Sequence, residues 1–410
     1  MGSKGGYLLV SNWPIFVYEN EYWIDHLWKK DLLLHLRYIK RLKLACPIVE
    51  SKPIANCQRI SSEVLNGIEL ISMPRCATKS EKIKNWFPFT CRLIKILLNA
   101  EIFHYTATGH PIIYAFINPF LRLVSGVKII GVVESSFWRK QSSKLWDIFV
   151  SRFSELGVRV ASYFSHIMIC TQTEYIKSLT FKNTAAYCIS AVWIDQDWIL
   201  TREAQEERVN WLKSDFQSGL KICFCGQLRP EKGLDILISA CCVLKSRNIP
   251  FELVVFGDGP NRGEYEEMAK KTLQSGFDFK GTVQYGKEFV QELKNNHILV
   301  VPNRSDERPR IIFDAGSQGL VTLGSETPGI LDILVEGENG YLFRKGDSNS
   351  LAEKLISVYY DPEQLSNISR NIVRFVEQNT HENMHKLRYQ ILLKHFHENG
   401  NAFYSAFREA

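Results

Sequence analysis

The chain has 410 residues, of which 45% are hydrophobic and 23% are charged, a composition typical of globular proteins and sufficient for two or three domains. Residues 1–200 contain 24 Lys and Arg against 15 Asp and Glu, a net charge of +9, whereas the remainder carries −3. The basic first half suggests an anionic partner, such as a membrane surface, an acidic saccharide or a phosphate-bearing acceptor, although it also serves solubility.

No run of the sequence approaches the roughly 20 apolar residues of a membrane-spanning helix, and the N-terminus lacks the pattern of a signal peptide. Ten cysteines are scattered along the chain, and neither Cys223-x-Cys225 nor Cys241-Cys242 has the spacing of zinc ligands. We therefore expect reduced thiols, no metal ion, and a cytoplasmic protein, either free or associated with the cytoplasmic face of a membrane.

In the first half, short apolar runs alternate with helical spans, a pattern that predicts a parallel, doubly wound sheet. The predicted helices cover about residues 112–123 and 145–164. The predicted strands are Tyr7–Val10, Ile102–Thr106, Lys128–Val133 and His166–Cys170.

Two basic segments of the first half have competing interpretations. Tyr22–Leu44 is helical in period and rich in Lys and Arg, so it is either a helix packed on the sheet with a solvated face or a surface lying on anionic lipid. A second cluster, Lys79–Lys95, interleaves basic residues with Trp86 and Phe87 and favours the membrane interpretation. No recognised nucleic-acid module accompanies these charges, so we expect no nucleic-acid partner.

Glu134 follows the strand Lys128–Val133, where it either acts on an acceptor hydroxyl or caps the following turn. His104 and His110 are alternative active-site candidates, although a lone histidine is more often structural. Residues 201–219 are charged and poor in strand formers, which suggests an interdomain linker.

The second half begins with a strand at Lys221–Gly226, and further strands are predicted at Phe251–Phe256, Phe277–Val283 and Ile298–Val301. An acidic loop follows the last of these, then a helix over 309–317, a strand at 320–323, and a helix that Thr327 caps with Pro328 at its first position. In parallel sheets, ligands lie beyond the carboxyl ends of strands and phosphates lie at helix N-termini. Asp306 and Asp314 could both face such a ligand, because carboxylates accept hydrogen bonds from sugar and ribose hydroxyls.

At these residues the chain resembles the retaining glycosyltransferases of GT-B fold in the glycosyl transferases group 1 family (family four). That family has an acidic residue, seven others, a second acidic residue and Ala; here Asp306 or its neighbour Glu307 supplies the first acidic residue and Asp314-Ala315 the second. Gly226-Gln227-Leu228-Arg229-Pro230-Glu231-Lys232-Gly233 is similar to the family's phosphate loop, with Gln227 in place of the usual arginine.

The resemblance implies a role for each matched residue. Lys232, with Arg229 or Gln227, would stabilise the departing diphosphate beside Gly226. Asp306 or Glu307 would bind the sugar hydroxyls and Asp314 the ribose, and Glu134 lies where many members place a histidine near the reacting sugar. Backbone N–H groups of the segment Thr327, Pro328, Gly329 and Ile330 would assist at the phosphates.

The resemblance also implies the fold class, α/β with GT-B architecture: two doubly wound Rossmann-like domains facing a central cleft. We expect an N-terminal acceptor-binding domain over residues 1–198, a linker over 199–219, a C-terminal nucleotide-sugar-binding domain over 220–388, and a last helix over 389–410 that returns to the first domain.

The reaction expected from the resemblance is transfer of a hexose-type sugar, with retention of configuration, from a UDP-sugar or GDP-sugar to an acceptor hydroxyl. No cofactor or metal is expected, and the donor is a substrate. The acceptor would be a saccharide or lipid-linked saccharide of surface polysaccharide or glycolipid synthesis, with peripheral association to an anionic membrane. Two alternatives are a family member with a small soluble acceptor, such as a natural product or phosphosugar, and a non-catalytic nucleotide-sugar-binding partner subunit.

Overall fold

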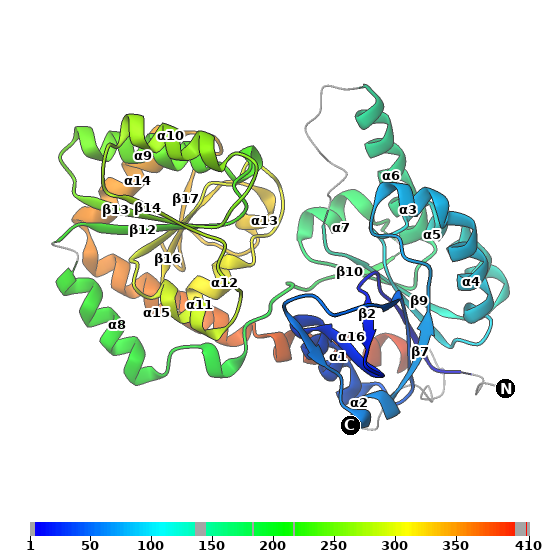
Figure 1. Cartoon of the computed structure of the whole chain (residues 1–410). Coiled ribbons are helices and arrows are strands. Elements are labelled where there is room, and N and C mark those ends of the chain that lie inside the picture. Colours follow the sequence, from blue (N-terminus) through cyan, green and yellow to red (C-terminus); the bar gives the residue numbers. More distant parts are fainter. Residues whose placement is uncertain (1–4, 136–144, 183, 216–217, 398–406, 408–410) are drawn as a thin grey trace. The chain divides into compact units, whose positions relative to one another are not determined.

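A computed structural model describes residues 5–135, 145–182, 184–215, 218–397 and 407 (Figure 1). The chain divides into two compact units, the first comprising Met1–Ser190 and His385–Ala410 and the second Ala191–Met384. Each unit is built on a parallel sheet wound in both directions from its first strand, so the predicted α/β class with two Rossmann-like units is confirmed. Among the described residues, no helix combines the length and apolar character needed to cross a bilayer.

The sheet of the first unit has seven parallel strands in the order β11-β10-β9-β8-β1-β4-β7. The first strand lies between β4 and β8, which makes this point the topological switch of the sheet. The strands are β1 (Tyr7–Val10), β4 (Leu42–Cys46), β7 (Ile68–Ser72), β8 (Ile102–Thr106), β9 (Lys128–Val133), β10 (Ile167–Cys170) and β11 (Ala185–Cys188).

A second, four-stranded sheet of the first unit was not expected. Its strands, in the order β5-β2-β3-β6, are β2 (Ile15–Tyr18), β3 (Glu21–Asp25), β5 (Ile48–Glu50) and β6 (Cys57–Arg59). A tight turn joins β2 to β3, with Glu19 and Asn20 both at positive φ. The expectation of one helix over Tyr22–Leu44 was therefore wrong: the segment is strand β3, helix α1 (His26–Tyr38) and the beginning of β4. Asp25 ends the strand and caps α1 by accepting from the N–H groups of Leu27 and Trp28.

The helices of the first unit connect the parallel strands and cover the sheet (Figure 1). The segment that precedes β8 forms two helices, and α5 and α6 follow at or near the expected bounds. These helices are α2 (Ser62–Asn66), α3 (Lys79–Lys84), α4 (Trp86–Leu97), α5 (Pro111–Val124), α6 (Leu145–Tyr163) and α7 (Thr173–Leu179). The last helix, α16 (His381–His397), begins in the second unit and belongs to the first from His385 onward.

The sheet of the second unit has six parallel strands in the order β14-β13-β12-β15-β16-β17, the order of a dinucleotide-binding sheet. Its strands are β12 (Leu220–Cys225), β13 (Phe251–Phe256), β14 (Phe277–Gly281), β15 (Ile298–Val301), β16 (Val321–Ser325) and β17 (Tyr341–Phe343). Its helices are α9 (Leu234–Ser246), α10 (Arg262–Thr272), α11 (Lys287–Leu293), α12 (Ile311–Ser317), α13 (Pro328–Leu331), α14 (Ser348–Tyr360) and α15 (Pro362–Gln378), with short 3-10 helices η1 (Gln196–Trp198) and η3 (Pro230–Lys232).

The segment expected to be an interdomain linker, residues 199–219, is mainly helix α8 (Arg202–Asp215) and belongs to the second unit. Only a narrow stripe of α8 is buried, including Val209 and Leu212, and most of the rest of the helix is polar. Arg208 is also buried, and its guanidinium donates to the carbonyl oxygens of Lys294 and Asn296. Such a helix has too few apolar positions to show a helical period in the sequence, which is why it resembles a linker.

Candidate functional site

Half of the predicted site residues lie in two loops at the topological switch point of the second unit. Strands β12 and β15 are neighbours in the sheet, and the chain leaves them into α9 and α12 respectively. The two loops therefore meet at the carboxyl edge of the sheet, where this fold binds ligands.

The loop after β12 is held tightly against the loop after β15. Gly233, the N-cap residue of α9, has a left-handed backbone with φ of 73°, and a Cβ there would collide with the carbonyl oxygen of Pro302. Gly226 donates its N–H to the carbonyl oxygen of Phe256 at 3.0 Å, while Gln227 and Arg229 are exposed. Only glycine permits the approach at 233, so the Lys-Gly pair of the sequence motif has a geometric reason.

Lys232 and Glu307 come together across the two loops. The Lys232 ammonium forms an ion pair with Glu307 Oε1, and Ser305 Oγ donates to the same oxygen at 3.1 Å. Asp306, one residue earlier, instead lies 3.4 Å from the Nζ of Lys345. Glu307 thus contacts the predicted phosphate-binding lysine, whereas Asp306 contacts a different lysine, and the assignment of the first carboxylate stays a prediction.

Helix α13 brings a third part of the predicted site to Glu307. A Cβ on Gly329 would collide with the backbone of Glu307, so α13 begins directly against the acidic loop. Thr327 is the N-cap residue with Pro328 next, as expected, but the Thr327 side chain makes no capping hydrogen bond.

The donor N–H groups expected over Thr327–Ile330 are fewer in the structure. Thr327 N–H donates to the carbonyl of Ser325, Pro328 has no N–H, and Ile330 N–H donates to the carbonyl of Thr327. Among the described residues of this segment, the N–H group that remains available to a ligand is that of Gly329.

Asp314 lies on α12 and is 6% exposed. Its Oδ1 accepts a hydrogen bond of 2.9 Å from the hydroxyl of Tyr285, and burial together with the Asp314 charge raises the pKa of Tyr285. Tyr285 therefore stays protonated and holds the carboxylate in place. The predicted contact of Asp314 with a ribose stays a prediction.

Arg304 is a site residue that the sequence analysis missed. Its guanidinium binds both carboxylate oxygens of Asp235, at 2.8 and 2.6 Å, and donates to the carbonyl of Pro230 at 2.7 Å. The side chain thus fastens the loop after β15 to the loop that carries Lys232. No signal in the sequence identifies it, because the pair joins residues 69 positions apart.

The remaining candidates lie in the first unit. Glu134 follows β9 and is exposed, and its carbonyl oxygen accepts from the hydroxyl of Thr171 at 3.1 Å. His104 and His110 are both buried: Tyr7 donates to His104 Nδ1 at 2.7 Å, and His110 packs on Phe89 with ring centroids 4.2 Å apart. The structural interpretation of both histidines agrees with these contacts.

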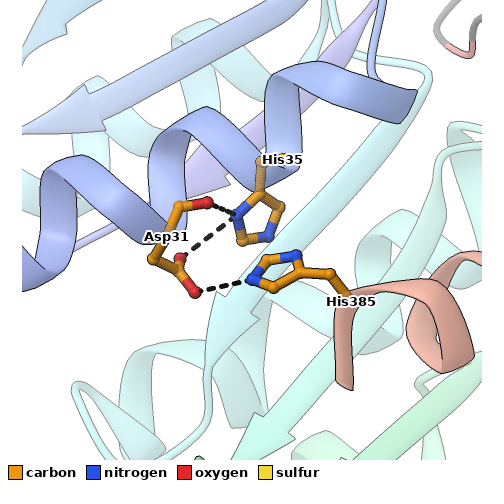
Figure 2. A group of neighbouring side chains, drawn as sticks. All are labelled: Asp31, His35 and His385. Carbon is orange, nitrogen blue, oxygen red and sulfur yellow. Dashed lines mark hydrogen bonds and ion pairs between the residues drawn. The ribbon is translucent and has the colours of Figure 1, made fainter. Parts of the chain in front are cut away.

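Asp31, His35 and His385 form the one group within the described residues whose side chains are arranged as metal ligands could be (Figure 2). Their oxygen and nitrogen atoms all lie within 4.8 Å of one another. His385 Nε2 lies 2.9 Å from Asp31 Oδ1, and His35 Nδ1 lies 3.1 Å from Asp31 Oδ2.

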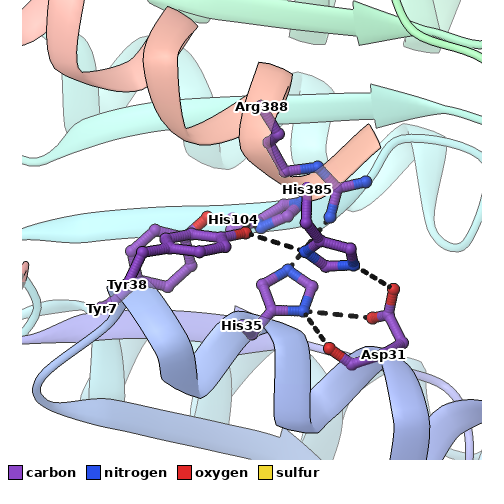
Figure 3. A network of polar contacts seen from close by, with 7 residues as sticks. All are labelled: Tyr7, Asp31, His35, Tyr38, His104, His385 and Arg388. Atoms are coloured by element: carbon purple, nitrogen blue, oxygen red, sulfur yellow. Dashed lines mark hydrogen bonds and ion pairs between the residues drawn. The ribbon is translucent and has the colours of Figure 1, made fainter. Parts of the chain in front are cut away.

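The surrounding hydrogen bonds fit a closed polar network better than a metal site (Figure 3). Arg388 Nη1 lies 3.0 Å from His35 Nε2, and because arginine only donates, His35 carries its proton on Nδ1, the atom that faces Asp31. Tyr38 donates to His385 Nδ1 at 3.3 Å and is itself hydrogen-bonded to Arg388, which completes a ring of five residues. Burial lowers the pKa of His385 well below its usual value, so its imidazole is neutral. The group fastens α16 to α1.

The fold defines a class of protein, a two-unit α/β protein with charged side chains at the switch point of its second sheet. Comparison with known proteins gives a family match for part of the chain. Residues 213–374 match the model of the family "Glycosyl transferases group 1", the family that the sequence motifs resemble.

Curated relatives match about two fifths of the chain. The sulfoquinovosyl transferase SQD2 of Arabidopsis thaliana is 30% identical over 163 residues, 39% of this chain and 30% of that protein. The 2-deoxystreptamine N-acetyl-D-glucosaminyltransferase of Niallia circulans is 26% identical over 149 residues, 36% of this chain and 38% of that protein. The matches therefore span less than half the length of these relatives.

Solved structures resemble the whole chain in fold. HepE of Anabaena, determined in complex with UDP, superposes with a TM-score of 0.64 at 13% identity, over 95% of this chain and all of that one. At this identity the likeness concerns the fold alone, and it agrees with the GT-B class expected from the sequence.

Proposed function

We propose that this protein is a retaining glycosyltransferase that transfers a sugar from a nucleoside diphosphate sugar to an acceptor hydroxyl. The observation that carries the proposal is the meeting of Lys232, Glu307 and Gly329 at the switch point of the second unit, inside the segment that matches the family model. A cation, a carboxylate and a backbone N–H at one strand edge suit a diphosphate joined to a polyol.

In this proposal Lys232 exchanges partners when the donor binds. Its ammonium leaves Glu307 for the diphosphate, where it balances the negative charge that grows as the bond from the anomeric carbon to phosphate oxygen breaks. Arg229, which is exposed on the same loop, adds a second cation, and Gln227 and Gly226 line the loop. Glu307, released from Lys232, accepts from the sugar hydroxyls, and Asp314 accepts from the ribose.

The acceptor oxygen attacks the anomeric carbon on the face that the phosphate leaves, which retains configuration, and the acceptor proton passes to the departing phosphate. The protein contributes positioning and charge stabilisation and no covalent intermediate. Glu134 is the residue of the first unit that we assign to the acceptor hydroxyl. For the nucleotide, the complex of HepE with UDP favours a uridine donor, and GDP-sugar is the alternative.

For the acceptor we propose a saccharide or lipid-linked saccharide of cell-surface polysaccharide or glycolipid synthesis, with peripheral association to an anionic membrane. The basic and aromatic first unit supports this acceptor. A small soluble acceptor is the second candidate, and the relative named for 2-deoxystreptamine favours it.

The test is a thermal-shift screen of the full chain with UDP, GDP and their common sugars, followed by measurement of nucleoside diphosphate release. A ligand that binds only the folded state stabilises it and raises Tm. At a ligand concentration a hundred times the Kd, the free energy of unfolding increases by about 2.7 kcal/mol. We expect one nucleotide class to raise Tm and its sugar to be slowly hydrolysed. Binding without any hydrolysis or transfer would favour a non-catalytic partner subunit, and no shift with any nucleotide would reject the proposal.

A further inference from the structure

The first half of α6 is exposed on every side. The buried residues of this helix are Gly157, Val158, Ala161 and Ser162, all in its second half. Before them lie large apolar side chains that face solvent, and three of them stack in sequence: Trp146 on Phe149 at 5.8 Å, and Phe149 on Phe153 at 6.1 Å. Because a helical segment of this length is marginal alone in water, an aromatic stripe of this kind is expected to have a partner.

The neighbouring helices α4 and α5 continue this apolar exposure. Helix α5 has an exposed stripe at helical spacing, with Phe116 at 74% and Leu123 at 78% exposure. A groove of about 160 Å³ between the two helices is lined by Ile94 and Leu98 from α4 and by Phe116 and Phe120 from α5. We call the exposed apolar side chains of α4, α5 and residues 145–156 of α6 the apolar face.

The exposed charges on α4 and α5 are all positive. These two helices contain Arg92, Lys95 and Arg122, all exposed, and no acidic residue. Residues 145–156 of α6 carry mixed charges, Arg152 with Asp147 and Glu155. Apolar and aromatic side chains with Lys and Arg around them are the pattern of surfaces that lie in the interface of an anionic bilayer, whereas a protein partner would not require this one-sided charge.

The position of the free half of α6 connects the apolar face to the ligand edge of the first sheet. Gly157 of α6 packs on the backbone of Pro111, and Asn118 of α5 donates to the carbonyl of Ala161 at 3.0 Å, so the two helices run in the same direction. Helix α5 begins just after β8 ends, at the carboxyl edge of the sheet. Residues 145–156 therefore extend past that edge (Figure 1), which is the edge that carries Glu134.

Helix α1, the other basic candidate, lacks such a surface. Leu32, Leu34, His35 and Tyr38 are buried, and the polar network holds the helix against α16. The solvated-face interpretation of α1 therefore agrees with the structure.

We propose that the apolar face docks this protein onto an anionic lipid bilayer, with the aromatic stripe of α6 in the interface and Arg92, Lys95 and Arg122 against the headgroups. The proposal specifies the surface behind the membrane association proposed above, and it does not depend on catalysis. It places the acceptor edge of the first unit beside the lipid, where a lipid-linked saccharide is presented.

The test measures flotation of the full chain with vesicles of phosphatidylcholine, alone or mixed with phosphatidylglycerol. We expect binding only to the anionic vesicles, weakening as salt rises. The triple variant Trp146→Ser/Phe149→Ser/Phe153→Ser should lose at least about tenfold in vesicle binding. The triple variant Arg92→Gln/Lys95→Gln/Arg122→Gln should lose about fivefold for each charge removed.

Matched controls lie in the second unit: Lys270→Gln/Lys271→Gln for charge and Tyr360→Ser, at 72% exposure, for an exposed aromatic. Both should bind vesicles as the wild type does, and all variants should keep the wild-type Tm, because the changed side chains are exposed. The proposal would be overturned if the wild-type protein did not bind anionic vesicles, or if the α6 variant bound them as the wild type does. A dimer that the α6 variant dissociates, without vesicle binding, would instead assign the face to a second copy. Hydrolysis of the soluble donor is measured separately, so failure of docking and failure of the transferase proposal are distinguishable.

Discussion

Lys232 with Glu307 in the second unit, and Arg388 with Asp31 in the first, each combine a cation with a carboxylate, but the surroundings differ. The Lys232 and Glu307 side chains are 23% and 42% exposed and touch directly. Arg388 and Asp31 are buried and are connected by hydrogen bonds through His35, His385 and Tyr38. An exposed pair contributes only about 0.2–1 kcal/mol, so a ligand can replace one partner, whereas breaking a buried pair costs about 3–5 kcal/mol. Exposure thus makes the first pair suitable for binding, and burial makes the second suitable for holding α16.

The largest expected effect is on stability, from Asp31→Asn. The amide cannot balance the charge of buried Arg388, and its NH2 group would replace one carboxylate oxygen and face the N–H group of one histidine. We expect a loss of about 3–5 kcal/mol in the free energy of unfolding, measured by urea denaturation with a probe in the first unit.

Asp258→Asn is the control for this change, because Asp258 is 51% exposed and lies 3.7 Å from Arg262. It should change stability by less than about 0.5 kcal/mol. A loss below about 1 kcal/mol in Asp31→Asn, or a Tm that rises with added Zn²⁺ only when Asp31 is present, would contradict the closed-network interpretation.

The next effect is on activity, from Lys232→Ala. Removing one preorganised donor to the developing charge costs about 2.7–4 kcal/mol, so kcat should fall about 10²- to 10³-fold while Tm stays near the wild-type value. Lys345→Ala is the matched control, since Lys345 is also a half-exposed lysine paired with a carboxylate of the same loop. Equal losses in the two variants would mean that general charge, and not the position of Lys232, governs activity.

A smaller effect separates the two neighbouring carboxylates. Glu307→Gln should lower kcat/KM about 10- to 150-fold, from the about 1.5–3 kcal/mol of a hydrogen bond to a charged group. Asp306→Asn should lower it less than about threefold, because Asp306 faces Lys345 in an exposed pair. Steady-state kinetics with a soluble acceptor decide this, and the reverse order would assign the sugar contact to Asp306.

The sequence predicted the buried parallel strands of both units better than the short or polar elements, for a physical reason. Strands buried on both faces are continuous apolar runs, and β1, β8, β9, β13 and β15 begin and end where such runs predicted them. The strands of the small sheet and helix α8 are short or mostly polar, so their patterns were hidden. Contacts between distant residues could not be predicted: Arg304 with Asp235 is 69 positions apart, and Asp31 with His385 is 354. By contrast, the sequence motifs did identify Lys232, Glu307 and Gly329, which lie close together in the structure.

The smallest expected effect is the change of stability with pH that the buried, neutral histidines of the first unit cause. Burial lowers the pKa of His110 to about 4 and that of His104 and His385 well below the usual value. The unfolded chain takes up protons near pH 6.5 while the folded chain does not. The stability that these neutral histidines contribute is therefore present above about pH 6.5 and is lost as pH falls. Each such histidine adds a slope of up to about 1.4 kcal/mol per pH unit.

His110→Phe calibrates this slope, because His110 packs on Phe89 outside the network. Urea unfolding from about pH 7.5 to about pH 5 gives the slope of the free energy of unfolding against pH. This slope should be shallower in the variant by the contribution of one histidine, and the contribution of the network histidines should be unchanged. If the variant lost all pH dependence, the network histidines would take up protons at the same pH in the folded protein as in the unfolded chain. Asp31 would then pair with imidazolium groups, and the contrast with the exchangeable Lys232–Glu307 pair would rest on burial alone.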